Sequence, residues 1–220
     1  AKDPHWTDGG KNLLRGAAQH TLQTTKKAPT LRQLRKLVNG TTEDLTARVI
    51  ELIATIQLPV VCVVRGWAVG LGCNLALAAD FTLAADTATF WEPFVDRGFS
   101  PDSGATWLLT RLVGVARARR MLLLGEKVDG ATAANWGLIH QAVDSDGLQD
   151  AAENLLGRLA SGPTVALGLA KRAIAYGQHA TLGQSMAQEL SDLELSARSA
   201  DFKEGLAAFR DRRTPDFQGR

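Results

Sequence analysis

The fold is decided by the stretch Pro59–Asp80, which reads PVVCVVRGWAVGLGCNLALAAD. Its first part, Val60–Val64, is a continuous apolar run rich in valine, which is typical of a strand buried on both faces. The small-residue segment Cys73–Ala79 predicts a helix, and between strand and helix stand Gly66, Gly70 and Gly72. Glycines let backbone N–H groups approach a ligand at a helix N-terminus, so this order predicts an anion-binding turn.

The glycine spacing matches neither of the common nucleotide-binding loops. A dinucleotide-binding turn would need a third glycine where Leu75 stands, and the sequence contains no Gly-Lys-Ser/Thr tripeptide for a P-loop. The alternative is that the glycines only allow close packing of strand against helix. Spacing alone leaves both interpretations open.

The rest of the chain alternates strands and helices and then becomes helical. The pattern predicts a helix from Thr41 that Pro59 ends, and later elements at 81–84 (strand), 103–112, 114–124 and 131–136 (helices) and 138–143 (strand). From Gly147 onward nearly every segment has helical periodicity. We therefore expect an α/β core over residues 1–146 and a helical C-terminal region over residues 147–220.

Composition excludes several classes of protein. The 220 residues are 45% hydrophobic and 22% charged with a net charge of +2, an ordinary globular balance that gives no reason to expect nucleic acid as a partner. No apolar run is long enough for a membrane span. Two cysteines in apolar surroundings predict a reducing, cytoplasmic setting, and the four histidines lack the spacing of a metal site.

Positive charge is concentrated near the N-terminus. Lys11–Gly40 contains seven basic residues and no acidic one, and we define its second half as the basic patch: Lys26, Lys27, Arg32, Arg35 and Lys36. The patch is either a solvated surface or a site for the phosphates of a small ligand. It contains no aromatic residue on which nucleic-acid bases could stack.

Pro59–Asp80 resembles the signature of the enoyl-CoA hydratase/isomerase (crotonase) family. The resemblance continues through shorter motifs at Ala88–Phe90, Gly98–Gly104, Leu112–Gly114, Leu124–Glu126, Trp136–Ile139, Arg198–Gly205 and Arg212–Phe217. It implies a crotonase-like α/β spiral core whose first strands would precede this chain, and C-terminal helices that pack between the subunits of a homotrimer or of a hexamer built as a dimer of trimers. From Trp136 onward the pattern is most similar to phenylacetate-pathway isomerases that act on ring-epoxide CoA thioesters.

The family resemblance implies an acyl-CoA thioester as substrate, with no cofactor beyond the CoA that the substrate carries. Two backbone N–H groups would form an oxyanion hole for the enolate, because preorganised donors stabilise charge that develops in the transition state. One would belong to Leu71 and the other to Gly10, in the loop Trp6–Lys11. The residues implied to contact substrate are Ala68, Gly70, Asn74 and Phe94.

The departures from the family pattern favour isomerisation. Hydratases of this family use two glutamates, and the resemblance puts Asn74 and Phe94 at their positions. Neither side chain exchanges a proton usefully. Glu92 and Asp96 are nearby carboxylates whose spacing does not match, whereas Asp102 occupies a position that carries the chemistry in the isomerase and dehalogenase branches.

We therefore expect an isomerase that shifts a double bond in a fatty or aromatic-pathway acyl-CoA, with Asp102 as the single acid and base. Its carboxyl group should be desolvated by Phe94, Phe99 and Trp107. The alternative role for Asp102 is a helix N-cap. The alternative functions are hydration, a lyase reaction, by an atypical residue set, and acyl-CoA binding without turnover.

One more pattern concerns assembly. Four apolar residues at helical spacing form a stripe, which we call the α-stripe: Leu182, Met186, Leu190 and Leu193. Such a stripe is either intramolecular core or, as the resemblance implies, part of a subunit interface.

Overall fold

The computed structural model describes residues 42–220. The chain divides into two units, Ala1–Arg48 and Val49–Arg220. The predicted helix near Thr41 is confirmed as α3 (Thr42–Thr55). Gly10 and the basic patch lie outside the described residues.

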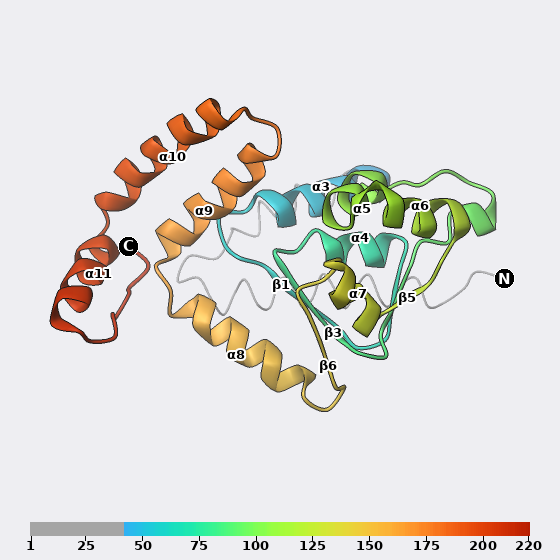
Figure 1. Ribbon diagram of the computed structural model, residues 1–220, viewed down its shortest axis with the longest axis horizontal. Coiled ribbons are helices and arrows are strands. Elements are labelled where there is room, and N and C mark those ends of the chain that lie inside the picture. Colours follow the sequence, from blue (N-terminus) through green and yellow to red (C-terminus); the bar gives the residue numbers. More distant parts are fainter. Residues whose placement is uncertain (1–41) are drawn as a thin grey trace. The chain divides into compact units, whose positions relative to one another are not determined.

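Within residues 42–220, six short strands form two small sheets (Figure 1). The first sheet is parallel throughout, in the order β1 (Val61–Val64), β3 (Phe81–Ala85) and β6 (Gln141–Val143). The second has the order β2 (Trp67–Val69), β4 (Thr89–Trp91) and β5 (Val128–Asp129), with β2 and β4 parallel and β5 antiparallel to β4.

The chain passes from one sheet to the other and back, which makes the core a spiral. β1 is followed by β2, β3 by β4 and β5 by β6, so each passage leaves one strand in each sheet. The helix α4 (Leu71–Leu77) returns the chain from β2 to β3, as a parallel pair requires. The expected α/β spiral core is confirmed, and the second sheet, with strands of two or three residues, is what the sequence patterns did not predict.

Three further helices and a short 3-10 turn complete the core. They are α5 (Ala105–Leu112), α6 (Gly114–Leu124) and α7 (Gly130–Trp136), close to the predicted positions, and η1 (Val95–Arg97), which the sequence did not predict. The largest apolar side chains without solvent exposure come from both sheets, from these helices and from the first C-terminal helix: Leu83, Phe90, Leu109, Met121 and Leu148. One continuous core therefore joins the spiral to the start of the helical region.

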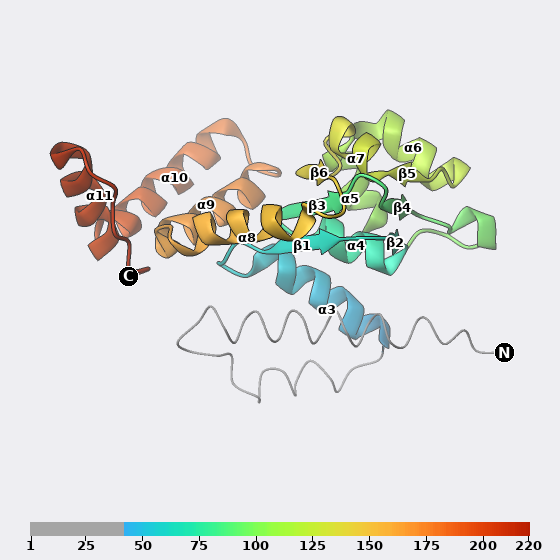
Figure 2. The same cartoon turned by 90° about the horizontal axis from the view of Figure 1, so that it is seen from below.

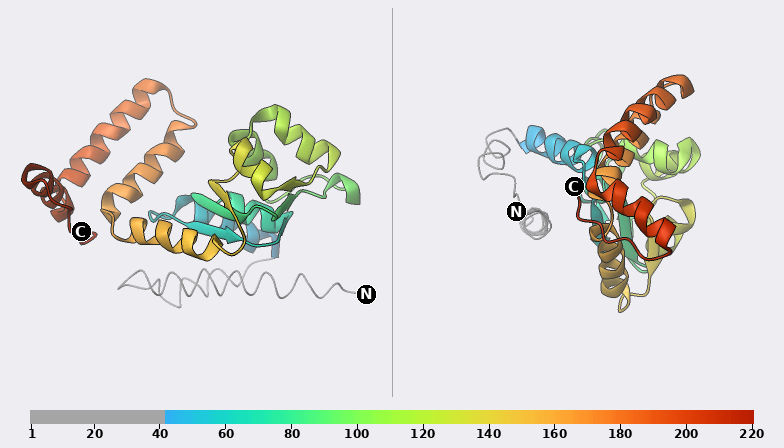
Figure 3. Two further views of the ribbon diagram at one scale, coloured as in Figure 1. Left: turned by 60° about the horizontal axis from the view of Figure 1, so that its bottom comes forward. Right: turned by 90° about the vertical axis from the view of Figure 1, so that its left-hand side faces the viewer.

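The C-terminal region consists of four helices, as expected. They are α8 (Leu148–Ala160), α9 (Thr164–Gly177), α10 (Leu182–Ala197) and α11 (Ala200–Asp211). α8 runs beside β1 and β3 (Figure 2), while α9 and α10 pair with each other and α11 follows (Figure 3). The domain boundary at residues 146/147 stays a prediction. No helix between residues 42 and 220 has the length and apolar character that crossing a membrane would require.

Lys171, whose side chain is 10% exposed, connects α9 to the core. Lys171 Nζ donates to the carbonyl oxygens of Ile53 at 2.7 Å and Leu58 at 3.2 Å and forms an ion pair with Asp80 Oδ2 at 2.7 Å. The same Asp80 oxygen accepts a hydrogen bond from the backbone N–H of Val60. Lys171 and Asp80 together thus connect the end of α3, the residues just before β1 and the end of the connection from α4 to β3.

The close approach of α7 to the end of β3 predicts the effect of a single added methyl group. A Cβ atom on Gly130 would lie 2.0 Å from the carbonyl oxygen of Ala85, which is backbone and cannot move aside freely. We expect Gly130→Ala to lower the free energy of unfolding by about 3 kcal/mol or more, measured by urea denaturation.

The matched control is Gly157→Ala in α8, where nothing lies within 4 Å of the added atom. The control should be neutral or stabilising by up to about 1 kcal/mol, because alanine favours a helix interior. Equal stability of the two variants would contradict this account of the α7–β3 contact.

Candidate active site

The glycine turn predicted from the sequence connects β2 to α4. Gly70 has φ 52° and ψ −117°, a backbone conformation that favours glycine. Its N–H donates to the carbonyl oxygen of Trp91 at 2.9 Å, which ties the turn to the end of β4, and its carbonyl oxygen accepts from Asn74 N–H at 2.9 Å. Leu71 is therefore the first residue of a helix, where backbone N–H groups lack an acceptor within the helix. Ala68 is buried in β2, opposite Phe90 of β4.

Asn74 connects α4 with the turn that carries Asp102. Its side chain is fully buried, and Nδ2 donates to the backbone carbonyl oxygen of Asp102 at 3.5 Å. Its Oδ1 atom has no hydrogen-bond partner among residues 42–220. The structure thus brings together two of the predicted site residues, which lie 28 positions apart in the chain. The roles predicted for them remain predictions.

Asp102 lies in an unusual turn before α5. Ser103 and Gly104 both have positive φ, 53° and 81°, so the backbone reverses sharply behind Asp102. The N-cap of α5 is Gly104 and no side chain caps the helix, so the alternative of Asp102 as N-cap is wrong. The carbonyl oxygen of Asp102 accepts from Ala105 N–H at 3.0 Å. A serine in this backbone region is strained, and such strain is common at functional turns.

The expected desolvation of Asp102 by three aromatic residues is wrong for the described chain. The Asp102 residue is exposed, as are Phe99 and Trp107. Phe94 is buried and contacts the Phe99 ring edge-on, with 5.5 Å between centroids. The Trp107 ring is covered instead by the Arg111 guanidinium at 4.1 Å.

Glu92 is the carboxylate that lies inside the core. It directly follows β4, it has no solvent exposure, and neither of its carboxyl oxygens has a hydrogen-bond partner of ordinary geometry among residues 42–220. Burial raises the pKa of Glu92 from its ordinary 4.5 to about 8; a hydrogen bond from the Cys73 thiol lowers this pKa, and the negative charge of Asp102 raises it further. At neutral pH the Glu92 carboxyl group is therefore mainly uncharged.

The sequence predicted no role for Glu92, because its spacing does not match the family pattern. The sequence does contain one signal, a carboxylate directly after the apolar strand residues Phe90 and Trp91. Burying a charged group at the end of such a strand costs free energy, so a carboxylate there suggests a function. Its neighbour Cys73 is fully buried, and burial, together with the charge of Glu92, raises the pKa of the Cys73 thiol well above its usual range.

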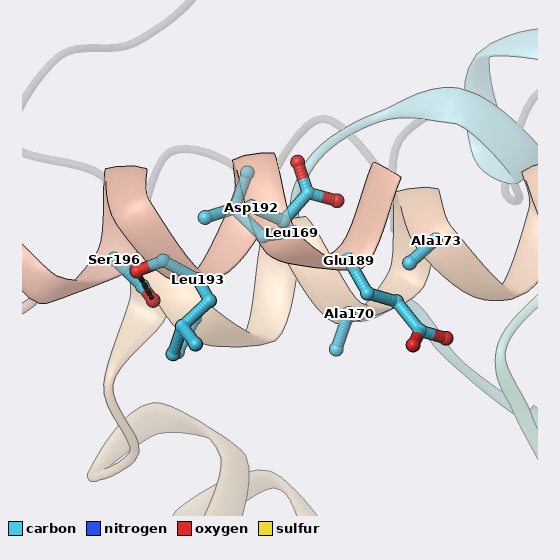
Figure 4. Close-up of a pocket in the computed structure, with 8 residues that line it drawn as sticks. Leu169, Ala170, Ala173, Glu189, Asp192, Leu193 and Ser196 are labelled. Atoms are coloured by element: carbon cyan, nitrogen blue, oxygen red, sulfur yellow. Dashed lines mark hydrogen bonds between the residues drawn. The ribbon is translucent and has the colours of Figure 1, made fainter. Parts of the chain in front are cut away.

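The groove between α9 and α10 is separate from these residues. It is lined mainly by small and apolar side chains with two carboxylates at its edge (Figure 4): Ala166, Leu169, Ala170, Ala173, Glu189, Asp192, Leu193 and Ser196. None of the predicted catalytic or substrate-binding residues lines it. The candidate active site is therefore the α4 turn with Asn74 and Asp102, and Glu92 is buried in the core beside Cys73 of α4.

The two-sheet spiral with a helical C-terminal region places the protein in the crotonase fold class. The crystal structure of an enoyl-CoA hydratase from Polaromonas sp. JS666 matches with a TM-score of 0.77 and 29% identity over 86% of this chain and 76% of that one. The model of the family described as enoyl-CoA hydratase/isomerase matches residues 26–220. The chain therefore belongs to the enoyl-CoA hydratase/isomerase family, as the motifs indicated.

Relatives with different activities are similar to this chain. The 1,2-epoxyphenylacetyl-CoA isomerase of Escherichia coli K12 is 42% identical over 168 residues, which cover 76% of this chain and 64% of that protein. A probable enoyl-CoA hydratase of Rhodobacter capsulatus is 40% identical over 171 residues, which cover 78% of this chain and 66% of that protein. The match thus spans just under two thirds of each of these relatives, and the family alone leaves the reaction open.

The conformation of Gly70 predicts a conformational rather than a steric cost of substitution. Nothing lies within 4 Å of a Cβ added there, so Gly70→Ala should destabilise only through its positive φ, by about 1–3 kcal/mol. Gly72→Ala is the matched control, since it also has free space and its φ is not positive. Thermal unfolding of the two variants should separate them clearly. A Gly70→Ala variant as stable as the control would show that the turn tolerates a side chain.

Proposed function

We propose that this protein is an acyl-CoA isomerase that shifts a double bond in an unsaturated acyl-CoA thioester. The observation that carries the proposal is the contact of Asn74 with the turn of Asp102. An amide stands where the family resemblance implies a hydratase glutamate, and that amide is joined to the turn of a carboxylate. One carboxylate that takes and returns a proton is sufficient for double-bond migration.

The proposed reaction uses two proton transfers at Asp102. The ionised carboxylate takes a proton from a carbon beside the double bond, and the electron pair of that C–H bond moves through the double bond to the thioester oxygen. The resulting dienolate would be held by the N–H of Leu71, with Gly10 as the second donor. Asp102 then returns its proton to the other end of the conjugated system, so the product is an isomer and no water is consumed.

The remaining site residues would shape the substrate pocket. Ala68 and Gly70 bring backbone close to the acyl-CoA, and Phe94 and Asn74 replace charged side chains with an apolar ring and a neutral amide. The exposed rings of Phe99 and Trp107 flank the Asp102 turn in sequence and suit an apolar or aromatic acyl group. The similarity to an epoxyphenylacetyl-CoA isomerase supports an aromatic-pathway substrate.

Hydration is the second candidate. It is favoured by the similarity to a probable hydratase and by Glu92, a second carboxyl group near Asp102. Non-catalytic binding of acyl-CoA is the third possibility that the sequence left open. Incubation with 2-enoyl, 3-enoyl and ring-derived CoA esters, followed by mass and NMR analysis, distinguishes them: an isomer has unchanged mass, a hydrate gains one water, and a binder returns the ester intact.

The proposal predicts the effect of removing the Asp102 carboxylate. Asp102→Asn should keep the fold and CoA-ester binding and lower kcat by at least ~100-fold, the scale of a lost acid–base group. The matched control is Asp150→Asn, an exposed aspartate in the first turn of α8. Near-normal turnover by a folded Asp102→Asn protein would remove Asp102 from the reaction.

We also propose a trimer or hexamer, in which the α-stripe packs against a neighbouring subunit. All four residues of the stripe are exposed in the single chain, between 55% and 77% of their area, so the alternative of intramolecular core does not hold within the described residues. A three-fold assembly uses two different complementary surfaces of each chain.

The assembly proposal predicts that charge on α10 separates the subunits. Met186→Glu combined with Leu190→Glu should lower the mass seen in light scattering toward the 23.6 kDa of one chain and lower turnover with it. Ser191→Glu, also exposed on α10 but outside the stripe, is the control and should keep the assembled mass. A wild-type protein that is fully active as a monomer would contradict the proposal.

A further inference from the structure

Glu92 is a buried ionisable group to which the proposed reaction assigns no task. Burying a carboxyl group without a strong hydrogen-bond partner costs free energy, and an apolar side chain would avoid that cost. Glu92 nevertheless lies fully buried at the end of β4, directly after Trp91, whose carbonyl oxygen holds Gly70 at 2.9 Å. It is thus adjacent in sequence to the residue that supports the glycine turn.

Two titratable groups act on Glu92, one in α4 and one in the turn before α5. Cys73 of α4 hydrogen-bonds to it through a thiol, which is a weak donor, and Asp102 before α5 acts on it through its negative charge. Cys73 lies between Leu71, the predicted oxyanion donor, and Asn74, which binds the Asp102 carbonyl. Glu92 therefore lies against the helical turn on which both halves of the proposed mechanism depend.

We propose that Glu92 is a positioning residue of this site, which supports the first turn of α4 in its neutral form and lowers turnover when it loses its proton. This inference rests on the proposed isomerase function. It adds Glu92 to Asp102 and Asn74 as a side chain on which turnover depends. Full turnover then requires that the buried Glu92 carboxyl group be protonated.

Charge explains why the neutral form is the working form. An ionised Glu92 would place a negative charge beside Cys73 of α4. This charge would repel the enolate that the Leu71 N–H is proposed to hold, and would therefore destabilise it. A buried carboxylate without a cation or a strong donor also draws water or forces a rearrangement, and this would disturb the Asn74–Asp102 contact. Both effects act in the same direction, toward lower turnover at alkaline pH.

The first test is the pH profile of kcat/KM for the wild type and Glu92→Gln, whose amide has the shape of the neutral acid and cannot ionise. The wild type should lose activity above a pH of about 8, where Glu92 ionises, by about tenfold per pH unit. Glu92→Gln should lack this alkaline decline. Cys73→Ala removes a hydrogen bond that favours the ionised form, so its decline should begin at higher pH than in the wild type.

The second test is thermal stability, which does not require turnover. Glu92 has a higher pKa in the folded protein than in the unfolded chain, so its stabilising contribution is complete below about pH 4.5 and is lost as the pH rises through about 8. The Tm of Glu92→Gln minus that of the wild type should therefore increase between these values and then level off. Glu153→Gln, an exposed glutamate of α8, should show no such trend.

The outcomes separate this inference from the proposed function. Identical alkaline declines in the wild type and folded Glu92→Gln overturn the positioning role. Loss of turnover by folded Glu92→Gln at pH 7 also overturns it, because the carboxyl proton would then take part in the reaction itself. If the wild type turns over no CoA ester, the isomerase proposal fails. In that case the Tm comparison still decides whether Glu92 is neutral in the fold, and the inferred effect on turnover falls with the isomerase.

Discussion

The parallel pairing of β1 with β3 is the constraint on which the rest of the structure depends. Two parallel strands cannot be joined by a hairpin, so the chain has to return along the sheet before the second strand begins. The return path here contains β2, the Gly70 turn and α4. The connection that the topology requires is therefore the segment that contains both Leu71 and the buried Asn74. The pairing of β1 with β3 thus determines where the candidate site lies.

The core around this connection contains unpaired polar atoms and a strained backbone turn, both of which lower the stability of the fold. Four buried polar side-chain atoms among residues 42–220 have no hydrogen-bond partner of ordinary geometry, and three of them belong to Asn74 and Glu92. The neighbouring turn holds Ser103 at positive φ. Unpaired polar atoms and backbone strain both destabilise a fold, so their presence in residues linked to Asn74 and Asp102 supports the proposed site.

In the helical region, α10 departs from the usual arrangement in which apolar side chains are buried and charged side chains are exposed. In α10 the buried residue is Asp192, which forms an ion pair with Arg172 of α9, whereas the residues of the α-stripe are exposed, Leu193 among them at the edge of the α9–α10 groove. The ion pair holds α10 against α9, where small side chains of α9 line the groove between the two helices (Figure 4). An exposed apolar stripe beside a buried charge is understandable if another surface covers it, which supports the proposed assembly.

The sequence by itself determined the family, the parallel α/β core and the helices, because the valine run of β1, the glycine spacing and the helical periodicities are local signals. It also singled out Asn74, Phe94 and Asp102 from motif positions. Only the tertiary structure decided that Asn74 contacts the Asp102 turn, that Asp102 is exposed, and that Glu92 is buried beside Cys73. The physical reason is that burial and polar contact arise between segments distant in the chain, when strands of two sheets and the helices between them come together. The short strands of the second sheet carry too few residues for periodicity to reveal them, and they are the ones that place Glu92 inside the core.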